Sequence, residues 1–177
     1  MKPLVLFSII LFLFAACADE KAEMLKKIKD TETAIFEKSQ NLGPGEVMSP
    51  EDDQALIDVL LDFYRAFPED EHAPECLDKV HMKYTGLADF KNAAAYGDTL
   101  LTNYKNYVNR AMILESLANI YDMNVSPRDT SKVRFYNELL LSENPDMTAE
   151  KAEDIRYRLD NIELSIVELI QKRITEQ

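Results

Sequence analysis

Apolar residues recur every three or four positions through most of the chain after residue 19, with polar residues between them. This period is typical of amphipathic α-helices. Proline, glycine and Asn-Pro signals interrupt the pattern and divide it into segments. The sequence therefore predicts an all-α fold, with helices over 19–41, 50–67, 73–85, 89–105, 109–122, 130–143 and 148–175.

Several helix ends carry local signals. Ser49 is suited to an N-cap, and Pro50 to the first helical position. Phe67 should end that helix, because the residue before a proline disfavours helical geometry. Gly86 is expected to be a left-handed C-cap. Leu42-Gly43-Pro44-Gly45 predicts a linker before the folded domain.

The stretch 77–107 predicts a helical hairpin, which cannot bury its apolar face alone and needs stacked neighbours. Similar segments lie on either side of its central part. LLDFYRAFP (60–68), LLTNYKNYV (100–108) and LLLSENP (139–145) align at offsets of 40 and about 37 residues. This period is typical of a helix-pair repeat.

Leu77, Val80, His81 and Tyr84, followed by Phe90 and Ala93, resemble the tetratricopeptide repeat. The ending Tyr64-x-x-Phe67-Pro68 is similar to the tetratricopeptide component of the β-barrel assembly machinery, and 117–122 resembles short tetratricopeptide lipoproteins of Bacteroidota. The resemblance covers roughly residues 50–170. It implies a right-handed α-solenoid of antiparallel helix pairs, and we place this domain at 49–177.

The first sixteen residues predict a signal peptide. Lys2 precedes an apolar run from Leu4 to Phe14, which is too short to span a bilayer but suits a signal-peptide core. Phe14-Ala15-Ala16-Cys17 resembles the lipobox of bacterial lipoproteins, although leucine is usual where Phe14 stands. The resemblance implies lipidation of Cys17, whose acyl chains would form a lasting membrane anchor.

Residues 17–48 would then comprise the anchor, an N-terminal helix and a linker. By resemblance to lipoprotein sorting, Ala18 after the cysteine favours the outer membrane. Whether the domain faces the periplasm or the cell surface stays open.

The net charge restricts the kinds of partner that the protein can bind. The formal net charge is −12, which repels phosphate backbones and disfavours nucleic-acid binding. With Cys17 assigned to the anchor, Cys76 is expected to be a lone buried thiol.

The sequence offers little catalytic chemistry. Cys76, Asp78 and His81 lack the paired ligand spacing of zinc sites, so we expect no metal. Nucleophile elbows, phosphate-cradling glycine loops and His-Glu metal motifs do not occur in it. We therefore expect a protein that is not an enzyme and needs no cofactor.

The expected function is a membrane-anchored, non-catalytic scaffold for an envelope protein. The tetratricopeptide resemblance implies a peptide groove on the inner solenoid face. Its predicted residues are Glu75, Asp78, Met82, Met112, Glu115 and Asn119. The alternative is an accessory lipoprotein that binds glycan or peptidoglycan fragments beside an outer-membrane transporter. Its aromatic candidates are Tyr96, Tyr104, Tyr107 and Tyr157.

The last predicted helix has two interpretations. Apolar residues recur through it at spacings near 3.5, which suits a cap over the end of the solenoid. Its far half, 165–174, could instead be a docking or dimerisation stripe.

Overall fold

The computed structural model describes residues 3–176, with side chains from residue 19 onward. It is all-helical over that range, as predicted, and no strand occurs between residues 3 and 176. The elements are α1 (Pro3–Gln40), α2 (Pro50–Ala66), α3 (Ala73–Gly86), α4 (Phe90–Asn103), α5 (Arg110–Asn119), the π-helical turn η1 (Ile120–Asn124), α6 (Thr130–Glu143), α7 (Ala149–Asp160) and α8 (Ile166–Thr175). The side chain of Cys17 and those of the predicted leader lie outside the described ones.

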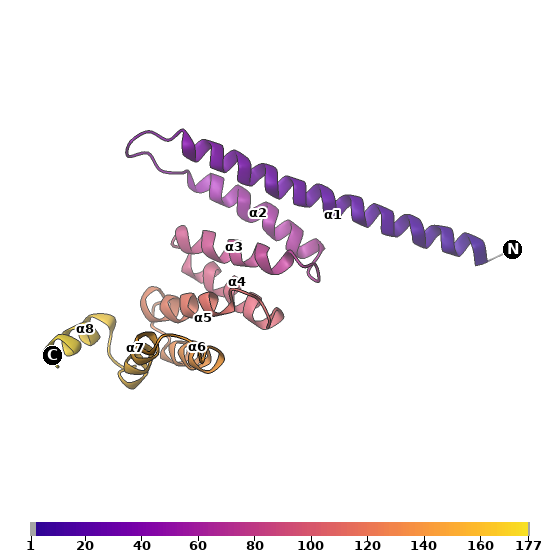
Figure 1. The fold of residues 1–177 in the computed structure, drawn as a ribbon. Helices are drawn as coiled ribbons and strands as arrows, with labels where there is room; N and C mark the ends of the chain where they lie inside the picture. Colours follow the sequence, from indigo (N-terminus) through magenta and orange to yellow (C-terminus); the bar gives the residue numbers. More distant parts are fainter. Residues whose placement is uncertain (1–2, 177) are drawn as a thin grey trace. The chain divides into compact units, whose positions relative to one another are not determined.

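The chain divides into two compact units, Met1–Lys83 and Tyr84–Gln177. In the first unit, α1 and α2 lie side by side (Figure 1). Ser49 caps α2 by accepting a hydrogen bond from the Glu51 amide, and Phe67 ends it, as the sequence predicts. Salt bridges join the helices of this unit, with Lys38 Nζ 2.5 Å from Asp52 and Lys79 Nζ 2.7 Å from Glu32.

The second unit begins with the end of α3 and contains α4 to α8. Its consecutive helices α4 and α5, α5 and α6, and α6 and α7 pack against one another. Fully buried leucines and a valine make their core. These are Leu100, Leu114, Leu117 and Val133. The tetratricopeptide-like solenoid stays a prediction.

The turn between α3 and α4 differs from the expectation. The left-handed residue is Ala88, with φ of 56°, whereas Gly86 still belongs to α3. The Asp89 amide donates to the Tyr84 carbonyl at 2.9 Å, and the Ala88 amide to Thr85 at 3.1 Å. This is the bonding pattern of a Schellman motif, which requires its left-handed residue two positions after Gly86.

The prediction of a single helix over 148–175 is also wrong. This segment forms two helices, α7 and α8, which are separated by a turn over 161–165. Ser165 and Glu168 form a reciprocal capping box that starts α8. A Ser-x-x-Glu sequence is the local signal for such a start, so this break was readable from the sequence.

No helix among the described residues is both long enough and apolar enough to span a membrane.

Candidate functional site

The second unit contains a polar cluster built around a π-helical turn. α5 runs directly into η1, where the wider turn is closed by a 3.1 Å hydrogen bond from the Val125 amide to the Ile120 carbonyl. Single π-helical turns often mark functional positions in helices. Here the turn carries Asp122, whose side chain is only 6% exposed.

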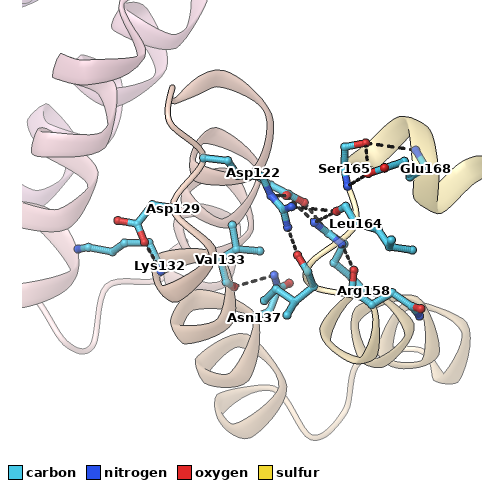
Figure 2. Close-up of polar contacts among 12 residues, drawn as sticks. Asp122, Asp129, Lys132, Val133, Asn137, Arg158, Leu164, Ser165 and Glu168 are labelled. Atoms are coloured by element: carbon cyan, nitrogen blue, oxygen red, sulfur yellow. Dashed lines mark hydrogen bonds and ion pairs between the residues drawn. The ribbon is translucent and has the colours of Figure 1, made fainter.

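Asp122 accepts hydrogen bonds from two arginines, as Figure 2 shows in part. Arg158 of α7 binds it through Nε at 2.6 Å and Nη2 at 2.7 Å. Arg128 donates from Nε to Oδ1 at 2.6 Å. Charge-assisted, bidentate bonds of this kind are among the strongest polar contacts in proteins.

The same two arginines also bind the turn between α7 and α8. Arg158 donates to the carbonyls of Asn161 at 2.8 Å and Leu164 at 3.0 Å. Arg128 donates to Leu164 at 2.9 Å and to Ile162. Backbone carbonyl oxygens are strong hydrogen-bond acceptors, so these contacts help to compensate the second guanidinium. The cluster thus fixes η1 to the α7–α8 turn, and both Asp122 oxygens are occupied.

A cavity of about 450 Å³ lies beside this cluster, and we call it the α5–α8 cavity. Both apolar and charged side chains line it. They include Glu115, Asn119, Leu140, Lys151, Asp154, Ile155, Arg158, Ile166, Leu169 and Arg173. Lys151 Nζ lies 2.5 Å from Glu115, and Arg173 pairs with Asp154. Both pairs are roughly half exposed, so water can reach them.

The predicted groove residues fall in both units. Glu115 and Asn119 line the α5–α8 cavity, and Met112, on the same helix, is 62% exposed. A groove that contains these three and the residues of α3 stays a prediction.

The three α3 residues have different environments. Met82 is 60% exposed, and Glu75 is exposed and forms a salt bridge with Lys79 at 2.9 Å. Asp78 is buried, at 7% exposure. A peptide would therefore reach Met82 and Glu75 more readily than Asp78.

The tyrosines considered for glycan binding are half-buried. Tyr96 stacks on Tyr84 with ring centroids 5.6 Å apart. Tyr157 donates to Glu176 at 2.8 Å, and Arg173 lies over its ring. Tyr107 accepts a 3.4 Å hydrogen bond from Asn109. Tyr96 and Tyr157 thus already use a ring face in contacts with other side chains.

Sequence reasoning missed a second polar cluster, around Asp98 of α4. This carboxylate accepts hydrogen bonds from Tyr121 at 3.1 Å and from Tyr136, and it pairs with Lys132. The two rings stack with centroids 5.7 Å apart. Burial, reinforced by the Asp98 charge, raises the pKa of Tyr121 to about 12, and burial also raises the pKa of Tyr136. The partners lie 23 to 38 residues apart, so no local signal reveals them.

Cys76 is a buried free thiol, as predicted, and burial raises its pKa to about 12. His81 is buried on the same helix. Among the side chains that the structure describes, no group of three or more His, Cys, Asp or Glu is placed to hold a metal ion.

No protein-family model matches the chain, and no curated protein or solved structure matches it significantly.

Proposed function

We propose that the protein is a non-catalytic interaction scaffold, held at the bacterial outer membrane by a lipid on Cys17. Its tetratricopeptide-like helix pairs would present a peptide-binding surface to an envelope protein. The lipobox-like sequence and the repeated helix-pair pattern support this proposal.

The observation that carries the binding role is the α5–α8 cavity. It combines apolar side chains such as Leu140, Ile155 and Leu169 with the partly exposed pairs Lys151–Glu115 and Arg173–Asp154. Exposed salt bridges contribute little free energy, so an incoming lysine or arginine could replace Lys151 on Glu115 at small cost. The apolar side chains would supply most of the affinity.

The test is an affinity pull-down of the lipidated protein from its own detergent-solubilised envelope. We expect one envelope protein or complex to be enriched, and enriched less with the Cys17→Ala form, which lacks the anchor. Retention of soluble glycan without any protein partner would instead favour the glycan-binding alternative.

A charge reversal then locates the surface. Glu115→Lys should release the partner, because it places a positive charge where the peptide's own cation would bind. Glu138→Lys on α6 is the matched control, since Glu138 is exposed and does not line the cavity. If Glu115→Lys leaves every co-purifying protein in place, the cavity is not the binding surface.

A further inference from the structure

The C-terminal helix α8 contributes three side chains to the α5–α8 cavity. These are Ile166, Leu169 and Arg173, and the rest of the wall comes mainly from α5, α6 and α7. Arg173 pairs with Asp154 of α7, which lines the same cavity. α8 therefore already presents two aliphatic side chains and one cation to the surface that we assign to the partner.

The three side chains lie on one face of α8, because they are three and four residues apart. Helices that bind in grooves of other proteins use anchors at positions i, i+3 and i+7. Such spacing fits any amphipathic helix, but here the structure itself places the anchors at a cavity. It also places the cation of α8 on an acid of the opposite wall. α8 is thus arranged as a helical ligand within its own chain.

α8 occupies this position loosely. None of its residues is buried, and the cavity beside it still has a volume of about 450 Å³. Both side chains of the Arg173–Asp154 pair are about half exposed, and exposed pairs contribute little free energy. The 2.8 Å hydrogen bond from Tyr157 to Glu176 is exposed as well. Moving α8 out of the cavity therefore costs little free energy.

The turn before α8 is fixed, whereas the helix itself is not. Arg128 and Arg158 donate to the Leu164 carbonyl at 2.9 and 3.0 Å. Both also bind Asp122 of η1. α8 then begins after Ser165 with a capping box of its own (Figure 2). The helix can thus leave the cavity as a unit about a fixed end, without disturbing the core.

We propose that α8 is an internal ligand of the α5–α8 cavity, and that the partner is an amphipathic helix that displaces it. This inference rests on the binding role of the cavity proposed above. The displacing helix carries aliphatic side chains in the places of Ile166 and Leu169, and a lysine or arginine in the place of Arg173. It binds more tightly than α8 when its side chains fill the volume that α8 leaves open.

A fluorescein-labelled peptide of residues 164–176 is the probe, and fluorescence anisotropy measures its Kd for the full chain. Arg173→Glu in the chain places two carboxylates together at Asp154, so α8 leaves the cavity more often. We expect the peptide to bind this variant about tenfold more tightly than the unaltered chain, because more of the chain is competent to bind. Arg156→Glu is the matched control, which should keep the unaltered Kd. It makes the same charge change at an exposed position of α7 that does not line the cavity.

Two altered peptides test which face of the helix binds. Leu169→Asp in the peptide should abolish binding to the Arg173→Glu chain, because Leu169 lines the cavity in α8. Val167→Asp should leave binding unchanged, because Val167 is 65% exposed in α8 and does not line the cavity. Equal affinity of the two altered peptides would overturn the proposal. Equal Kd values of the unaltered peptide for the unaltered chain and the Arg173→Glu chain would also overturn it.

A charge swap locates the bound peptide. Asp154→Lys in the chain repels the cation at position 173 of the peptide, so this chain should prefer a peptide that carries Arg173→Glu. Preference for the unaltered peptide would contradict binding in the cavity.

The peptide assay needs no envelope partner, so the two proposals can fail separately. If Glu115→Lys releases an envelope protein but Arg173→Glu does not change peptide binding, the scaffold stands and the role of α8 is refuted. If the peptide behaves as expected but the pull-down enriches no protein, α8 is an internal ligand and the scaffold is refuted.

Discussion

At the residue scale, Asp122 is the carboxylate to which both Arg128 and Arg158 bind. It compensates two guanidiniums that are themselves largely buried. Removing one partner of a buried ion pair is costly because it leaves an uncompensated charge. We expect Asp122→Asn to lower the free energy of unfolding by about 3 kcal/mol, as measured by urea denaturation.

The matched control for Asp122→Asn is Glu138→Gln, which removes a carboxylate paired with Arg134 on the surface of α6. Both side chains of that pair are about half exposed, so the change should cost less than about 0.5 kcal/mol. Equal effects of the two substitutions would contradict a structural role for the Asp122 cluster.

The raised pKa of Tyr121 predicts how the stability of the fold changes at alkaline pH. Its pKa is about 12 in the folded chain against an ordinary value of 10.0. The folded state therefore keeps its proton more tightly than the unfolded state does, so this contribution to stability is complete below pH 10 and is lost between pH 10 and about 12. Tyr121→Phe, which cannot ionise, should flatten the fall in unfolding free energy over that window.

Ultraviolet absorbance titration follows the tyrosine ionisation directly. Asp98→Asn should move the Tyr121 transition toward lower pH, because it removes the negative charge that opposes ionisation. If Tyr121 ionises at the same pH in the Asp98→Asn variant, then burial alone raises its pKa.

At the scale of elements, the α3–α4 turn holds an alanine in a conformation that favours glycine. Ala88 has φ of 56°, which costs about 1 kcal/mol for a residue with a Cβ atom. Ala88→Gly should therefore raise the thermal midpoint, which differential scanning calorimetry would measure. Ala95→Gly on the exposed face of α4 is the control, and it should lower the midpoint, since glycine disfavours a helix interior.

At the scale of the whole molecule, α8 is either a cap on the helical domain or a docking element. Removing it distinguishes these two roles. Because α8 buries none of its residues, a chain ending at Ser165 should keep its remaining helices and a cooperative unfolding transition in circular dichroism. Leu117→Ala is the comparison, because it removes a fully buried side chain and should lower the free energy of unfolding by about 3 kcal/mol. A truncated chain that loses cooperativity would show that α8 is a cap.

The all-helical class and most helix boundaries could be predicted from the sequence, because the apolar period and the helix-capping residues are local features. Ser49-Pro50 placed the start of α2, and Phe67-Pro68 its end. The Ser165-Glu168 capping box carried the same kind of signal, although the apolar spacing that continues past it favoured one long helix. Cys76 was assigned correctly to the interior, because a free cysteine usually behaves as a small buried hydrophobic residue.

Which polar groups meet depends on how the helices pack, and the sequence does not reveal it. Asp122 and Arg158 are 36 residues apart, as are Glu115 and Lys151, and neither pair has a spacing that a single helix could bring together. The packing of α5, α6 and α7 sets those distances, and the same packing leaves the α5–α8 cavity between them. The apolar stripe of α8 was readable as a stripe, but whether it faced the core or solvent depended on which side of the helix the contacts with Asp154, Tyr157 and Asn161 would occupy.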